Sequence, residues 1–313
     1  MSKQVFVLKV SDDMMEVRAD KLLALRFKDL SRTRLQKCFD KKQVFFGDKV
    51  INKCYKISEP GTIKVFFEET KKHLFPEAVP IPLNIQYEDD SIIVINKCSG
   101  MVIHPGNGTS NDTLVHALLH HCDGKLSTVG SPLRPGIVHR LDKETSGLVV
   151  AAKSDLSHYK LADAFSNRLV KKKYYVIISG QPKLKSGICT ESIGRHPIHR
   201  TKMTTVNEGK GRHAHTEWRV IDTIGKMATL IECNILTGRT HQIRVHMSNL
   251  GFPILGDTLY GFKKNNFKNI EIKRVFLHSS FLEFNHPISG EVISFSLELP
   301  NEFKRIIEII RDI

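Results

Sequence analysis

The sequence predicts an α+β protein with a small N-terminal α+β domain and a larger domain on a mainly antiparallel sheet. With 313 residues, the chain is long enough for both domains. Three prolines within residues 75–84 disfavour regular helix or central strand and are typical of a linker. Beyond them, many short apolar runs and few helical patterns favour a sheet without regular strand–helix alternation. We therefore expect domains at 1–75 and 85–313, with a linker at 76–84.

Two helices and a strand pair are expected in the N-terminal domain. Residues 18–30 form a leucine-rich helical pattern, and a second helix follows with Ser31 as its N-cap. The stretch "QVFFGDKVI" at 43–51 predicts a strand, a Gly-Asp turn and another strand. The side chains predicted to face inward are Leu22, Leu23 and Leu25 in the first helix, and Leu35, Cys38 and Phe39 in the second.

Strand patterns dominate the larger domain. Residues 91–97 and 101–106 are expected to pair around Ser99-Gly100, and 112–122 indicates an amphipathic helix opened by Asp112. Further helices are expected near 154–168, 240–250 and 301–312. Further strands are expected at 172–180, 201–206, 213–221, 227–236, 274–284 and 292–299.

The chain is strongly basic, with 47 Lys and Arg against 33 Asp and Glu, and a net charge of +14. This excess suggests a polyanionic partner, either nucleic acid or an acidic membrane surface. Residues 1–80 carry 17 basic and 11 acidic residues, so the shorter domain is the more densely basic one. A run of cations in one helix is more often a solvated face than a binding site. In the second helix this run comprises Arg32, Arg34, Lys37 and Lys41.

Cysteine usage and hydropathy indicate a cytoplasmic protein. The six cysteines are scattered without a CxxC pair, which is typical of reduced thiols. The residues between Lys3 and Lys9 are too few for a signal-peptide core, and no apolar run reaches membrane-spanning length. We therefore expect no targeting segment and no membrane association.

Histidines are frequent, but they do not form a metal-binding pattern. His241 and His246 are five residues apart, whereas a helical zinc protease needs histidines four apart with a glutamate after the first. No cysteine is near enough in the sequence to complete a structural zinc site. "ETSGL" lacks the first glycine of a nucleophile elbow, and "GNGTSN" lacks the lysine of a phosphate-binding loop. We expect no metal and no cofactor.

The stretch "RPGIVHRLDKETSGLVVAAK" at 134–153 places a polar cluster directly before an apolar run that predicts a buried strand. Asp142 follows Arg140 by two residues, so in extended backbone both side chains project to the same face. They could form a structural ion pair. They could also belong to a glycosidase, with Glu144 as the second carboxylate. The residues alone do not separate these interpretations.

"HRLDKETSGL" resembles the central motif of the RluA-type pseudouridine synthases. In the same order along the chain, "KKYYVIISG" resembles the tyrosine-bearing strand of that family, and "TGRTHQIRVHM" its arginine-bearing motif. "LGDTLYG" and "LHSSFLEFNHP" also fit the family pattern. Residues 17–67 are similar to the αL RNA-binding motif, which would grip RNA phosphates with its basic helix. Together these resemblances cover nearly the whole chain.

The resemblance implies isomerisation of uridine in RNA without metal or cofactor, on the pseudouridine synthase fold. Asp142 matches the catalytic aspartate, and Arg140 the arginine that fills the space left by the flipped base. Tyr174, rather than its neighbour Tyr175, matches the tyrosine that stacks on the uracil. Arg239 matches the arginine that pairs with the aspartate. A residue of the apolar floor is expected at Leu277.

"VIHPG" and "RPGIVHRLDKETSGL" are most similar to the RluD branch, whose members modify large-subunit ribosomal RNA. An RluC-like branch also carries an αL module, so both specificities stay open. We expect a monomeric enzyme whose partner is RNA. Two other classes stay open: a non-catalytic RNA-binding or ribosome-assembly factor that kept the fold, and a hydrolase that releases free uracil.

Overall fold

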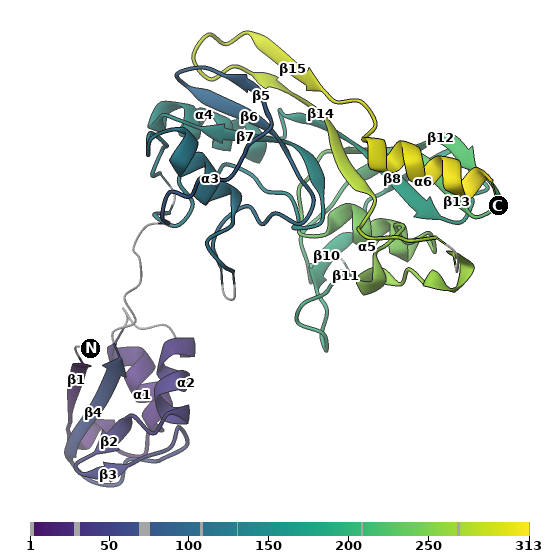
Figure 1. Ribbon diagram of the computed structural model, residues 1–313. Coiled ribbons are helices and arrows are strands. Elements are labelled where there is room, and N and C mark those ends of the chain that lie inside the picture. The colour runs from purple at the N-terminus through teal and green to yellow at the C-terminus, as the bar shows by residue number, and fades with distance from the viewer. Residues whose placement is uncertain are drawn as a thin grey trace. The chain divides into compact units, whose positions relative to one another are not determined.

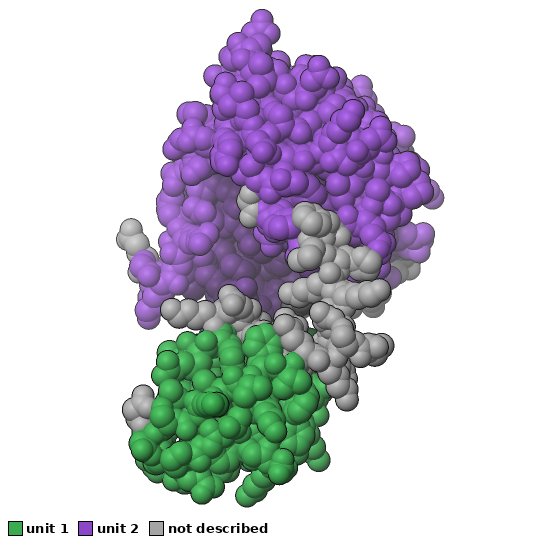
Figure 2. Space-filling view, turned by 90° about the vertical axis from the view of Figure 1, so that its left-hand side faces the viewer, with its two compact units in different colours: residues 1–73 green, residues 74–313 purple. Residues whose placement is uncertain are grey.

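The computed structural model describes residues 3–27, 32–68, 76–106, 109–129, 131–207, 209–267 and 270–312. The chain forms two compact units, Met1–His73 and Leu74–Ile313 (Figure 2). Each unit has hydrophobic clusters of its own. The proline-rich segment predicted as a linker, residues 76–84, lies within the second unit. There Val79 N donates to the carbonyl of His116 (3.1 Å), and Asn96 N to that of Asn84 (2.8 Å).

The first unit combines a four-stranded antiparallel sheet with two helices (Figure 1). The strand order is β1-β4-β2-β3, and the predicted helix pair and strand–turn–strand are confirmed. The helices are α1 (Ala19–Arg26) and α2 (Arg32–Asp40), with a short 3-10 helix at Asp12–Met14. The strands are β1 (Lys3–Val10), β2 (Val44–Phe46), β3 (Lys49–Val50) and β4 (Gly61–Glu68).

The core of the first unit lies between the helices and one face of the sheet. All the predicted inward side chains are buried except Leu25, which is 68% exposed. The prediction for Leu25 was wrong because Leu22 and Leu23 already occupy the buried face of this short helix. Ser31, the predicted N-cap of α2, lies outside the described residues.

A nine-stranded sheet forms the centre of the second unit (Figure 1). Its order is β5-β6-β7-β14-β8-β13-β12-β9, with β15 paired to β14. Every pair is antiparallel except β7 with β14, which confirms the predicted fold class. The strands are β5 (Ile85–Glu88), β6 (Ile92–Lys97), β7 (Ser146–Ala152), β8 (Lys171–Ser179), β9 (Ser186–Cys189), β12 (Thr216–Ile224), β13 (Ala228–Ile235), β14 (Leu277–Asn285) and β15 (Val292–Ser296).

Helices cover both faces of this sheet. Strand residues alternate between the faces, so Val149 belongs to the same hydrophobic cluster as residues of α3 (Leu114–His121) and α5 (Gln242–Asn249), whereas Leu148 belongs to a cluster with α4 (Asp155–Ser166). Helix α6 covers the second face beside β8 and β13. A separate hairpin, β10 (Ser192–Arg195) with β11 (Met203–Val206), lies next to α5. The helices are α3 (Leu114–His121), α4 (Asp155–Ser166), α5 (Gln242–Asn249) and α6 (Asn301–Arg311), with 3-10 helices at Thr258–Tyr260 and Lys264–Phe267.

Two predicted elements differ from the structure. Residues 101–106 are not a strand, because their carbonyls are used to start α3: Leu114 N donates to Val102 O (2.8 Å) and Val115 N to Ile103 O (3.0 Å). The N-cap of α3 is Thr113 rather than Asp112, and its side chain forms a capping box with His116.

No helix among the described residues is long and apolar enough to cross a membrane.

Candidate active site

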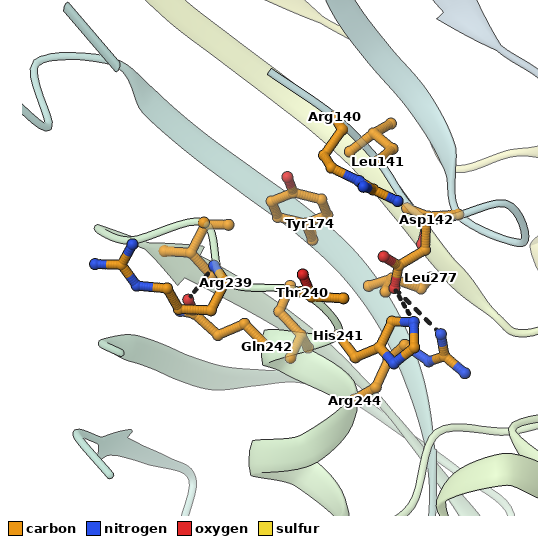
Figure 3. Close-up of a pocket in the computed structure, with 14 residues that line it drawn as sticks. Arg140, Leu141, Asp142, Tyr174, Arg239, Thr240, His241, Gln242, Arg244 and Leu277 are labelled. Carbon is orange, nitrogen blue, oxygen red and sulfur yellow. Dashed lines mark hydrogen bonds and ion pairs between the residues drawn. The ribbon is translucent and has the colours of Figure 1, made fainter. Parts of the chain in front are cut away.

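Asp142 lies in a turn, residues 139–146, that leads directly into β7; we call it the Asp142 turn. Thr145 N donates to the Asp142 carbonyl (3.1 Å) and closes the turn. β7 is buried along its whole length and pairs with β6, so it supports the turn rigidly. The Asp142 side chain is 16% exposed and lines a pocket together with residues of β8, β14 and the loop before α5 (Figure 3).

His139 anchors the start of the Asp142 turn to β7. Its Nε2 accepts a hydrogen bond from Val150 N (3.0 Å), and its ring stacks on Phe165 with centroids 4.4 Å apart. Burial lowers the pKa of His139 to about 3, so this nitrogen stays unprotonated and can accept the bond. The histidine therefore has a structural role in the motif.

Lys97 anchors the other side of the turn from within the core. Its side chain is almost fully buried, and its ammonium donates to the carbonyls of Cys98 (2.7 Å), Met101 (3.0 Å) and Lys143 (3.2 Å). Ser99 Oγ adds a bond to the carbonyl of Glu144 (2.7 Å). The segment after β6 is thus tied to the backbone carbonyls of Lys143 and Glu144, the two residues that follow Asp142.

We expect the stability contributed by Lys97 to increase at alkaline pH. Burial lowers the pKa of Lys97 from 10.5 to about 8 in the folded protein. Between these pH values the unfolded chain binds more protons than the folded one, so the free energy of unfolding rises with pH. Denaturant unfolding should show the gap between wild type and Lys97→Met widening by about 2 kcal/mol from pH 7 to pH 10. The exposed Lys226→Met is the control, and a gap that narrows over this range would refute the interpretation.

Gly147 is required where β7 meets β14. Its φ is 108°, and a Cβ at this position would lie 2.1 Å from the carbonyl oxygen of Ser279. Gly147 and Ser279 are partners in the parallel pairing of the two strands. A side chain here would separate β7 from β14 and displace the Asp142 turn.

The side chain that pairs with Asp142 is Arg244, in the first turn of α5. Its Nη1 lies 3.2 Å from Asp142 Oδ2, and its Nε and Nη2 donate to Asp257 at 2.7 and 3.0 Å. The guanidinium also lies over the ring of Tyr260, 4.9 Å from its centroid. Burial lowers the pKa of Arg244, but the bonds and charges of the two aspartates outweigh it and raise that pKa. One buried, permanently charged arginine therefore bridges two carboxylates and orients Asp142.

The prediction that Arg239 pairs with Asp142 was wrong. Arg239 Nε donates to the carbonyl of His213 (3.0 Å), and its guanidinium points away from Asp142 (Figure 3). Beyond Arg239, the backbone passes through the left-handed region at His241 (φ 58°) and enters α5, which turns Arg244 toward Asp142. "TGRTHQIR" contains both arginines, and the sequence interpretation chose the first.

Tyr174 and Leu277, which the resemblance matched to the stacking tyrosine and the apolar floor, both line the pocket. Tyr174 is 6% exposed and faces the pocket, whereas Tyr175 packs on the other face of the sheet with the α6 cluster. Burial raises the pKa of Tyr174, so its hydroxyl stays protonated. Leu277 contributes apolar lining, and Arg140 is exposed at the rim beside Asp142 (Figure 3).

Four site residues were missed by the sequence analysis: Arg244, His241, Asp257 and Tyr260. His241 Nε2 lies 3.9 Å from Asp142 Oδ2, and its Nδ1 is hydrogen-bonded to the Tyr260 hydroxyl (2.7 Å). Burial lowers the pKa of His241, against the effect of the Asp142 charge. A signal for all four was present, because His241 and Arg244 belong to "TGRTHQIRVHM", and Asp257 and Tyr260 belong to "LGDTLYG". No cluster of potential metal ligands occurs among the described residues.

The sequence profile of RNA pseudouridylate synthase matches residues 91–249. The chain is 39% identical over 310 residues to the ribosomal large subunit pseudouridine synthase D of Zymomonas mobilis, covering 96% of each chain. It is 38% identical to the uncharacterized RNA pseudouridine synthase YlyB of Bacillus subtilis, covering 97% of each. Among solved structures it is similar to human RNA pseudouridylate synthase domain containing 4, with a TM-score of 0.56 and 26% identity over 73% of this chain and 93% of that one.

These matches agree with the order of motifs and with a pocket built around one oriented aspartate. The family profile covers the Asp142 turn, Tyr174 and Arg244, and the similarity to bacterial relatives extends through the N-terminal unit. The chain therefore belongs to the RNA pseudouridine synthases, in the RluA/RluD-type group, and is an enzyme that isomerises uridine in RNA.

Proposed function

We propose that this enzyme converts specific uridines of large-subunit ribosomal RNA to pseudouridine, with Asp142 as the catalytic residue. The observation that carries the proposal is a single carboxylate, 16% exposed, held by Arg244 at 3.2 Å in a pocket also lined by Tyr174. The Asp142 carboxylate can act at the ribose only if it is aimed, and the ion pair with the buried guanidinium of Arg244 fixes its direction.

Asp142 can act by two routes. In the first, Asp142 Oδ attacks the ribose C1′ and the bond from C1′ to uracil N1 breaks, leaving the electron pair on the base. The base then turns, C5 attacks C1′, and the aspartate leaves. In the second, Asp142 removes the 2′ proton, the electrons of that C–H bond form a double bond between C1′ and C2′, and the base leaves with the electron pair of the C1′–N1 bond. After the base turns, Asp142 returns the proton to C2′, and C5 uses its electron pair to bond to C1′. In both routes the proton on C5 is finally lost to solvent.

The other pocket residues suit a flipped nucleotide. Taking a uridine out of a stack costs a few kcal/mol. Stacking on the Tyr174 ring would return about 1–3 kcal/mol. Leu277 offers an apolar contact to the base, and Arg140, exposed at the rim, can occupy the vacated space while bonding phosphate.

The proposed substrate rests on relatives named as large-subunit enzymes in Zymomonas mobilis, Nitrosomonas europaea and Buchnera aphidicola, at 37–39% identity. The test is to map pseudouridines in ribosomal RNA from cells with and without this protein. We expect specific large-subunit sites to lose the modification and to regain it with the wild-type gene. An unchanged map of pseudouridines in large-subunit ribosomal RNA would refute the proposed substrate. A requirement for the protein but not for Asp142 would favour the assembly-factor alternative.

We propose that the N-terminal unit binds RNA through its phosphates. It is densely basic and contains none of the pocket residues. Lys37 and Lys41 are exposed at the end of α2, and the side chains of Arg32 and Arg34, in its first turn, lie outside the described residues.

We expect removal of residues 1–73 to weaken RNA binding while turnover at saturating RNA is largely kept. Each lost phosphate contact should flatten the dependence of log K on log salt by about 0.7 to 0.9. Substituting Arg32, Arg34, Lys37 and Lys41 by Gln together should reproduce most of this change. A truncated enzyme that stays folded and binds equally tightly with an equal salt dependence would refute the role.

A further inference from the structure

Three arginines gather at one side of the pocket: Arg168, Arg212 and Arg239. Arg239 lines the pocket, and its Nε donates to the carbonyl of His213, the residue that follows Arg212. Strands β8 and β13 pair with Asn234 opposite Lys173, so Arg168, which precedes β8, lies at the same end of this strand pair as Arg239, which follows β13. Arg168 follows Asn167, the C-cap of α4, and has a φ of 61°. Arg212 is held by two backbone hydrogen bonds to Ile193. The three come from separate parts of the sequence and meet only in the folded chain.

The cluster carries positive charge that no carboxylate balances. Burial, and after it the repulsion from the positive charges of Arg212 and Arg168, lower the pKa of Arg239. Nearby surface cations have acidic partners: Lys171 pairs with Glu283 (2.7 Å), and Arg219 with Glu232 (2.9 Å). Across the described part of the chain, no ion pair joins the three arginines to Asp or Glu. A bound anion would relieve this repulsion.

Arg239 is positioned in advance for such an anion. Its backbone N donates to Gln242 Oε1 (3.0 Å), and its Nε donates to the carbonyl of His213 (3.0 Å). These bonds fix the direction of the guanidinium, which points away from Asp142, and leave its Nη groups unused among the described residues (Figure 3). A guanidinium with two outward N–H groups matches the geometry of a phosphate.

We propose that Arg168, Arg212 and Arg239 form a binding site for a backbone phosphate of the RNA next to the target uridine. The inference rests on the proposed function for the RNA's identity. Since Arg239 lines the same pocket as Asp142 and Tyr174, the phosphate belongs to a nucleotide close to the flipped one. With Arg140 at the rim near Asp142, cations would hold the strand at two places along the pocket.

The test measures binding without turnover, in the Asp142→Asn background. The probes are transcribed large-subunit ribosomal RNA and a short oligouridine, titrated between about 50 and 200 mM salt. One variant changes Arg168, Arg212 and Arg239 to Gln. The matched control changes Lys226, Lys304 and Arg305 to Gln, which removes the same charge from exposed positions on α6 and the β12–β13 turn.

We expect the cluster variant to lose about 0.7 to 0.9 in the slope of log K against log salt, the amount for one phosphate, and Arg239→Gln alone to lose most of it, with the control near wild type. Thermal unfolding should not fall, because the variant removes repulsion. Equal slopes for the cluster variant and the control would overturn the proposal. If the triple variant does not fold, the single variant Arg239→Gln decides, because a salt slope equal to that of wild type in this variant would also overturn the proposal. The salt slope is measured without turnover, so it tests the phosphate site alone. The proposed function is tested separately, because it would be refuted by an unchanged pseudouridine map of the large-subunit RNA.

Discussion

Asp142→Asn is expected to reduce tritium release from RNA labelled at uracil C5 by more than 10²-fold, because loss of a nucleophilic or general-base group has effects of at least this size. The substitution nearly preserves the volume of the side chain, so it removes the charge next to Arg244 without changing the shape of the site. RNA affinity should stay close to that of wild type, since Asp142 is one of many pocket groups. Residual turnover above about one per cent of wild type would refute the assignment.

Glu144→Gln is the matched control for Asp142→Asn. Glu144 lies two residues further on in the same turn, and its carbonyl, not its carboxylate, accepts the bond from Ser99. We expect this variant to keep turnover within a few-fold. A loss equal to that of Asp142→Asn, together with free uracil among the products, would instead indicate a two-carboxylate hydrolase.

Arg244→Met is expected to reduce turnover at saturating RNA by about 10²-fold or more, because Asp142 loses the donor that aims it. Arg239→Met makes the same change five residues earlier in the same motif. For Arg239→Met we expect turnover at saturating RNA to stay within about threefold, while the half-saturating RNA concentration rises. Single-turnover and steady-state kinetics of the two variants separate these effects. Equal losses of turnover in the two variants would support the pairing of Arg239 with Asp142 that the sequence predicted.

Stability must be controlled in this comparison, since Arg244 also neutralises the buried Asp257. Breaking a buried ion pair by removing one partner costs about 3–5 kcal/mol. The double variant Arg244→Met with Asp257→Asn removes both charges and should recover much of the unfolding free energy. Its turnover should stay low, because Asp142 still lacks its partner. Recovery of turnover with stability would show that Arg244 acts only by maintaining the fold.

Most of the fold could be predicted from the sequence, because helix and strand patterns depend on local spacing. Buried strands such as β7 and β8 were recognisable as apolar runs. Strand alternation predicted that Tyr174 and Tyr175 face opposite sides of the sheet, and the resemblance to the family indicated Tyr174. The strand expected at 101–106 failed because its carbonyls accept bonds from the start of α3. That competition involves residues some twelve positions apart, so local pattern does not reveal it.

The sequence by itself determined the family and the fold class, since ordered motifs and strand patterns specify these directly. Only the tertiary structure decided which arginine pairs with Asp142. Arg239 and Arg244 are equal candidates in the motif, but a left-handed residue and the start of α5 turn them in different directions. The cluster of Arg168, Arg212 and Arg239 was likewise invisible in sequence. Electrostatic contacts depend on distance in space, and folding alone brings these separated charges together.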